Sequence, residues 1–140
     1  MTGTPRAVAR RLGAVCIAGL LIGCATTTHP MLTGSVSYRE RIALPDNAEI
    51  EIQLSDVSRQ DVTANVIAET TFRPAGRQVP IPFELPYPAD RIQADHTYAV
   101  RAVIRGEGRM LFTTNTAHHV LTRGNPSRVE MLLVRADGRD

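Results

Sequence analysis

A stretch at positions 79–87, Val-Pro-Ile-Pro-Phe-Glu-Leu-Pro-Tyr, has an apolar side chain at every second position and proline at three of the positions between. Period-two alternation is typical of a strand with one face on a core. Backbone groups of a strand also alternate between its two lateral neighbours, and proline has no N–H to donate. Pro80, Pro82 and Pro86 therefore remove donors from the same side. The strand is predicted to pair on one side only and to lie at a sheet edge.

The same alternation recurs along the chain. Residues 48–55 show it most clearly, with aliphatic side chains alternating with Glu49, Glu51, Gln53 and Ser55, which indicates one buried and one wet face. Further strands are predicted at residues 32–39, 64–72, 96–105, 109–116 and 128–135, with turn sequences between them. Residues 90–95 are expected to hold a single helical turn. The sequence therefore predicts an all-β domain over residues 32–140, a small antiparallel β-sandwich of about seven strands.

The N-terminal segment predicts a lipid anchor. Three arginines precede an apolar run at residues 12–22, and Leu21-Ile22-Gly23-Cys24 resembles a bacterial lipobox, whose cysteine is acylated before the chain is cut on its amino side. A helix formed by this run would be only about 16 Å long, whereas a membrane-spanning helix needs about 20 residues. We therefore expect a cleaved lipoprotein signal peptide at residues 1–23, then a lipidated Cys24 and a flexible spacer over residues 24–31.

Removing residues 1–23 changes both the charge and the thiol content. Of the sixteen basic residues three leave, so thirteen face fourteen acidic ones, and no charge argument for nucleic-acid binding remains. Cys16 leaves too, and an acylated Cys24 cannot form a disulfide. Two or more acyl chains would hold the domain stably on a bilayer. Ala25, rather than the Asp that retains many such proteins at the inner membrane, favours the outer membrane, with the domain in the periplasm.

The residue patterns predict no catalytic residue, no cofactor and no metal site. His118 and His119 are adjacent, so in a strand they point to opposite faces and cannot readily chelate one ion. Glu49 and Glu51 share a wet face, where ion pairs with cross-strand arginines are the favoured interpretation over acid and base chemistry. Ser58 and Ser127 offer hydroxyls, but no nucleophile-elbow sequence surrounds them.

Four runs of sequence carry a resemblance to a known family. They are residues 34–61, GSVSYRERIALPDNAEIEIQLSDVSRQD; residues 78–87, QVPIPFELPY; residues 96–104, HTYAVRAVI; and residues 110–135, MLFTTNTAHHVLTRGNPSRVEMLLVR. Together they resemble the YbaY family of lipoproteins, which shares its domain with the YscW type of secretion pilotin, also called a lipoprotein chaperone. The resemblance covers nearly all of residues 32–135. It implies a lipobox cysteine, a role that falls on Cys24, and supplies no catalytic residues.

The resemblance implies a non-catalytic module that binds or escorts another envelope protein, because pilotins of this type carry a secretin subunit to the outer membrane. The expected partners are thus the membrane, through acylated Cys24, and a secretin or other outer-membrane protein. Two alternatives stay open: a structural envelope lipoprotein without a dedicated partner, and an enzyme acting on envelope glycan or peptide. The predicted partner contact is the loop beside the proline-rich edge, at Tyr87, Pro88, Asp90 and Arg91.

Overall fold

The computed structural model describes Gly3, Cys24 and residues 26–136. The predicted signal peptide at residues 1–23 lies outside the described residues apart from Gly3. Within the described part the chain forms eight strands and one short 3-10 turn, η1, which spans Ala89–Arg91. The strands are β1 Met31–Tyr38, β2 Glu49–Asp56, β3 Asn65–Phe72, β4 Ile81–Pro86, β5 Tyr98–Gly106, β6 Arg109–Thr113, β7 His118–Val120 and β8 Arg128–Arg135.

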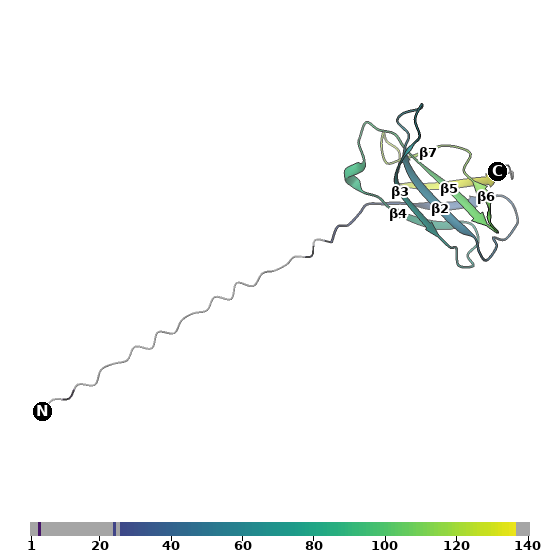
Figure 1. The fold of residues 1–140 in the computed structure, drawn as a ribbon, viewed down its shortest axis with the longest axis horizontal. Coiled ribbons are helices and arrows are strands. Elements are labelled where there is room, and N and C mark those ends of the chain that lie inside the picture. The colour runs from purple at the N-terminus through teal and green to yellow at the C-terminus, as the bar shows by residue number, and fades with distance from the viewer. Residues whose placement is uncertain (1–2, 4–23, 25, 137–140) are drawn as a thin grey trace.

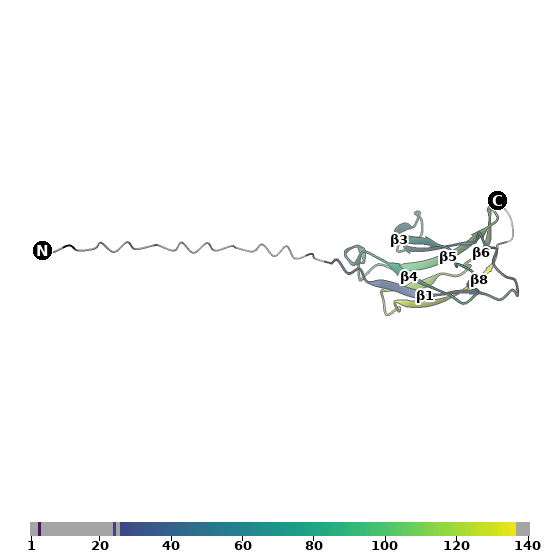
Figure 2. The same cartoon turned by 90° about the horizontal axis from the view of Figure 1, so that it is seen from below.

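The strands form one strongly curved sheet that nearly closes into a barrel (Figure 1). Their order is β3-β2-β5-β6-β8-β1-β4, and β7 pairs with the first residues of β5. In the view of Figure 2, β3 and β5 lie in one layer above β1 and β8. The prediction of an all-β domain is confirmed. The strand that the sequence did not predict is β7, which has only three residues.

One strand pair departs from the predicted antiparallel arrangement. β1 and β8 run parallel, with Gly34 opposite Val129, while the other neighbours in the sheet are antiparallel. The prediction of an antiparallel sheet is therefore wrong at this pair, because side-chain alternation carries no information about strand direction. Gly34 permits the close approach: a Cβ there would overlap the carbonyl oxygen of Val129 and lie 2.9 Å from Cε1 of Phe83.

A single hydrophobic core fills the interior of the sheet. All eight strands contribute to it, and β2, β4 and β5 do so through every second residue, as the alternation predicted. Fully burying a large apolar side chain contributes about 1.5–3 kcal/mol, so a domain without a disulfide can be held by such a core. The largest fully buried side chains are Tyr98, Phe112, Leu32, Ile50, Ile52, Leu54, Ile81, Leu85, Ile104, Met131, Leu133 and Val36.

The two ends of the sheet, β3 and β4, approach each other without pairing. β4 pairs with β1 alone, which confirms the edge predicted from its prolines. The N–H of Tyr87 donates to Pro30 on the β1 side, so by alternation Pro82, Glu84 and Pro86 direct their backbone groups to the open side. Of these three residues only Glu84 has an N–H to offer there. The proline-rich edge thus explains why the barrel does not close.

Outside the core, β2, the strand with the clearest alternation, carries two ion pairs. Glu49 lies 3.1 Å from Arg73, and Glu51 lies 3.7 Å from Arg105. This confirms the interpretation of Glu49 and Glu51 as partners of neighbouring arginines. Among the residues described here, no helix is long and apolar enough to span a membrane.

Candidate functional site

The predicted lipid-attachment residue lies shortly before the barrel. Cys24 is exposed, and β1 begins at Met31. The six intervening residues reach about 20 Å at most when extended. Acylation of Cys24 remains a prediction from the sequence. An acyl group there would hold one particular end of the barrel, where β1 begins, close to the membrane; we call it the anchor-side end.

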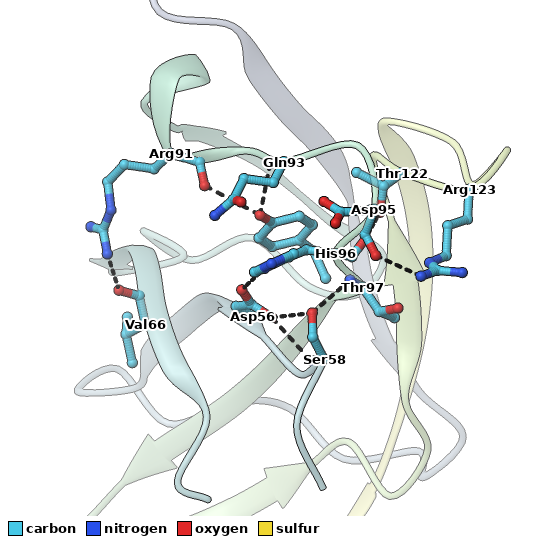
Figure 3. A network of polar contacts seen from close by, with 11 residues as sticks. Asp56, Ser58, Val66, Arg91, Gln93, Asp95, His96, Thr97, Thr122 and Arg123 are labelled. Atoms are coloured by element: carbon cyan, nitrogen blue, oxygen red, sulfur yellow. Dashed lines mark hydrogen bonds and ion pairs between the residues drawn. The ribbon is translucent and has the colours of Figure 1, made fainter.

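Three loops meet at the anchor-side end, because the strands beside β1 begin or end there. They are residues 57–64 between β2 and β3, residues 87–97 between β4 and β5, and residues 121–127 between β7 and β8. Figure 3 shows side chains from all three loops close together around His96, with Ser58 from the first loop, Gln93 from the second and Thr122 from the third. The loops are therefore connected by polar contacts rather than lying separately over the end of the barrel.

Asp56 is the centre of one part of this network. Its Oδ2 lies 2.6 Å from Nδ1 of His96, and its Oδ1 accepts from the N–H and hydroxyl of Ser58 at 2.9 and 2.5 Å. The Ser58 oxygen in turn accepts the N–H of Thr97 at 2.9 Å. Burial alone would raise the pKa of Asp56, but the hydrogen bonds from Ser58 and His96 outweigh it, and the pKa lies below its ordinary value.

This trio of serine, histidine and aspartate is not arranged as a hydrolytic triad. In a triad the serine hydroxyl bonds to the imidazole, which bonds to the carboxylate through its other nitrogen. Here the Ser58 hydroxyl donates to Asp56 itself, the same carboxylate that contacts His96. The Ser58 hydroxyl is therefore not placed for activation by the His96 imidazole. The three residues instead join the end of β2 to the start of β5.

Tyr98 is the second fixed point of the anchor-side end. Its side chain is fully buried, and its hydroxyl accepts the N–H of Gln93 at 2.9 Å and donates to the carbonyl of Arg91 at 3.2 Å. A tyrosine hydroxyl that bonds to backbone a few residues upstream is the arrangement of a tyrosine corner. These bonds hold the segment after η1 against the barrel.

Arg91 closes the anchor-side end of the space between β3 and β4. Its guanidinium donates to the carbonyls of Val66 and Ile67 on β3 at 3.3 and 3.4 Å. Figure 3 shows the side chain extending from η1 towards Val66. The third loop is joined in a similar way: Thr122 donates to the carbonyl of His96 at 2.7 Å, and Arg123 donates to that of Asp95 at 2.5 Å.

The four predicted contact residues lie together at the anchor-side end, but they differ in availability. Tyr87 and Pro88 are half-buried, and Tyr87 packs against the core. Arg91 is occupied by the β3 carbonyls. Asp90 is exposed, without an ion pair among the described residues. Asp90 is thus the member of the set whose side chain can contact a partner without breaking a described contact.

The two histidines considered as ligands lie on β7. His118 is half-buried beside β5, where burial lowers its pKa, and His119 is exposed. Among the residues that the structure describes, no three side chains of His, Cys, Asp or Glu come together as a metal site would require.

Two hollows lie away from the anchor-side end, and sequence reasoning missed both. One, of about 380 Å³, separates β3 from β4 and is lined by Phe72, Ile81 and Phe83 among others. The other, of about 990 Å³, lies between the loop after β1 and the β5–β6 hairpin at the opposite end of the barrel. The arginines flanking the hairpin, Arg105 and Arg109, were the available signal for the second hollow.

Comparisons with known proteins place this geometry among envelope lipoproteins. Residues 27–133 match the family of the type III secretion system lipoprotein chaperone, YscW. The uncharacterized lipoprotein YbaY of Escherichia coli strain K12 is 32% identical over 107 residues, which are 76% of this chain and 55% of that protein. The chain thus spans about half the length of that curated relative. An alternative pilotin from the type II secretion system of Vibrio cholerae is 44% identical, with a TM-score of 0.76, over 79% of this chain and all of that one.

Proposed function

The chain belongs to the YscW family of type III secretion system lipoprotein chaperones, and we propose that it is a lipid-anchored escort that binds a secretin subunit and carries it to the outer membrane. The observation that carries this proposal is the similarity to the Vibrio cholerae pilotin, which extends over the whole of that chain at 44% identity. The exposed Cys24 upstream of the barrel supports the membrane-bound part of the proposal.

The proposed role is binding without catalysis. The serine, histidine and aspartate that come together at the anchor-side end are engaged in holding loops, as described above. A barrel on a short tether suits an escort, since the acyl group would attach the protein to the membrane and the barrel would bind the partner. The tether also keeps any bound partner within a few tens of ångströms of the bilayer.

We further propose that the segment at Tyr87, Pro88, Asp90 and Arg91 contacts the partner near the membrane. Its exposed members project from η1, whose backbone is fixed by Tyr98 and Arg91. A fixed loop loses less conformational entropy on binding than a mobile one. Changing Asp90→Arg should weaken secretin binding without loosening the barrel, whereas Arg91→Ala should loosen the end of β3 as well.

The test of the escort role is the distribution of the secretin in a strain lacking this protein. Inner and outer membranes are separated by density, and the secretin subunit is quantified in each. The proposal expects the subunit to shift from the outer to the inner membrane and to return when the wild-type chain is supplied. An unchanged distribution would overturn the proposal and favour a structural lipoprotein without a dedicated partner.

A further inference from the structure

The larger of the two hollows described above lies at the end of the barrel opposite to the start of β1, and we call it the distal groove. One wall is the loop at residues 42–45, between β1 and β2. The other wall is the β5–β6 hairpin together with the end of β8, residues 105–113 and 135–136. Its volume of about 990 Å³ is at the upper end of the range for ligand pockets, which is about 300–1,000 Å³. A hollow of this size has room for several side chains of a peptide segment.

Both walls of the distal groove are held in place by contacts within the domain. The Tyr38 hydroxyl donates to the carbonyl of Ile42 at 2.8 Å, and the N–H of Leu44 donates to Gln78 at 3.2 Å. On the other side the N–H of Ala136 donates to the carbonyl of Leu111 at 2.9 Å. The groove is thus formed before any partner arrives, which lowers the entropy lost on binding.

A glycine allows the two walls of the groove to approach each other. A Cβ added at Gly106 would lie 2.8 Å from Cγ of Pro45 and 2.9 Å from Cδ1 of Leu111. Pro45 and Leu111 belong to opposite walls. The loop and the hairpin therefore come close together at this position.

The lining of the distal groove combines apolar side chains with an excess of positive charge. Ile42 is 48% exposed, and Met110 and Leu111 are half-buried. The charged lining residues are Arg105, Arg109 and Arg135, against a single acid, Glu107. Arg109 lies 3.7 Å from Glu107 in an exposed ion pair, which is worth only about 0–1 kcal/mol, and Arg105 lies 3.7 Å from the half-buried Glu51. A partner's carboxylate can therefore replace Glu107 at small cost.

The position of the groove favours a protein over an anionic lipid as its occupant. β1 starts at the anchor-side end and leads directly into the groove wall. Eight residues rising about 3.3 Å each put roughly 25 Å between the two ends of the strand. In Figure 2 the chain enters β1 at the N-terminal side of the domain, and β6 lies at the opposite side. The groove thus lies at the end of the barrel opposite to the start of β1, away from the end that an acyl group on Cys24 would hold near a bilayer.

We propose that the distal groove binds an acidic segment of the secretin subunit, whose apolar side chains contact Ile42, Met110 and Leu111 while its carboxylates contact the arginines. This inference rests on the proposed escort function and names the surface and the chemistry that would carry it. Arginine is suited to the task because its planar guanidinium binds a carboxylate through two parallel hydrogen bonds. The contact proposed at Asp90 lies at the other end of the barrel, so the two surfaces can be tested separately.

The experiment measures how much secretin subunit is recovered with the full-length, membrane-extracted protein after purification in mild detergent. The test variant is Arg109→Glu with Arg135→Glu. Both side chains are exposed, so the barrel should stay folded. The matched control is Arg59→Glu, an exposed arginine in the β2–β3 loop at the anchor-side end. We expect the double variant to lose about tenfold or more of the recovered secretin and the control to retain it.

A second variant guards against misfolding, because it should act in the opposite direction. Glu107→Gln removes the one acid of the groove lining and should raise secretin recovery, most clearly at low salt, where charge interactions are least screened.

Equal recovery by the double variant and the wild type would overturn the groove proposal while leaving the escort proposal standing. Loss of binding to anionic vesicles, with secretin recovery unchanged, would also overturn it and identify a lipid occupant. A deletion strain with normal secretin distribution would overturn both proposals.

Discussion

His96 and Asp56 join two strands at the anchor-side end of the barrel, with 2.6 Å between Nδ1 of the imidazole and Oδ2 of the carboxylate. Asp56 ends β2 and His96 precedes β5, and β2 pairs with β5 along its whole length. The contact thus closes the end of a ladder that runs through the core. The contact should make the free energy of unfolding depend on pH in the acid range.

The pKa of Asp56 is lower in the folded chain than its ordinary value, because its hydrogen bonds favour the ionised form. The folded state then binds fewer protons than the unfolded state, so this contribution is present above the ordinary carboxyl pKa of about 4 and is lost as pH falls through the lower folded value. We expect Asp56→Asn to cost about 1–3 kcal/mol at neutral pH and to weaken the acid dependence. Urea unfolding between pH 7 and 3 measures both, with Asp61→Asn as control. Parallel pH profiles for the wild type and Asp56→Asn would contradict the assignment.

The Tyr98 hydroxyl should contribute to stability out of proportion to its size. Tyr98→Phe removes two part-buried hydrogen bonds, one to the N–H of Gln93 and one to the carbonyl of Arg91, and at about 0.5–1.5 kcal/mol for each bond the loss should be about 1–3 kcal/mol of unfolding free energy. The matched control is Tyr87→Phe, since Tyr87 is half-buried and its described bond comes from the backbone. Denaturant titration of the three chains compares them. Equal losses for the two variants would show that the hydroxyl bonds of Tyr98 contribute nothing special.

Gly34 should tolerate no side chain. An alanine Cβ there would meet the Val129 carbonyl of the parallel neighbour and the Phe83 ring. Overpacking of a core typically costs about 1–3 kcal/mol, and here the obstacle is backbone, which cannot move aside without breaking the β1–β8 pairing. Ser35→Ala, on the other face of the same strand, is the control and should be near neutral. Thermal unfolding measures the difference, and a melting temperature for Gly34→Ala equal to that of the control would contradict the register.

The prolines of β4 should keep the barrel monomeric by blocking its edge. Replacing Pro82 and Pro86 with threonine restores two N–H donors on the open side of the strand, and an exposed edge with a full set of backbone groups pairs readily with another chain. We expect concentration-dependent self-association, measured by sedimentation in detergent. Pro126→Thr in the β7–β8 loop serves as control. A double variant that sediments like the wild type would mean that the prolines do not protect this edge.

The residue pattern predicted the strands in which the alternation of side chains runs over many residues. It missed a strand too short to alternate visibly, and it could not give the direction of strand pairing. The strand predicted at residues 48–55 is β2, shifted by one position, and the proline-rich edge was placed correctly. β7 was missed because three residues, His118 to Val120, are too few to show a period. The parallel pairing of β1 with β8 was missed because alternation is the same for either strand direction.

The candidate sites divide in the same way. Cys24 could be proposed from a local motif, and its lipidation remains to be tested. Arg91 was singled out for partner binding, yet its guanidinium contacts carbonyls of Val66 and Ile67, some 25 positions earlier in the chain. The distal groove joins residues 42–45 to residues 105–113 and 135–136. No local pattern can reveal such a junction, because it exists only after the sheet has curved.

In the proposed function, an acyl group on Cys24 determines the membrane to which the secretin subunit goes. The most direct measurement replaces the wild-type chain with Cys24→Ser and follows both the variant and the secretin subunit through separated inner and outer membranes. We predict that the variant leaves the outer-membrane fraction and that the secretin subunit is lost from it in parallel. A secretin that still reaches the outer membrane in full amount, with the Cys24→Ser chain absent from that membrane, would contradict the claim.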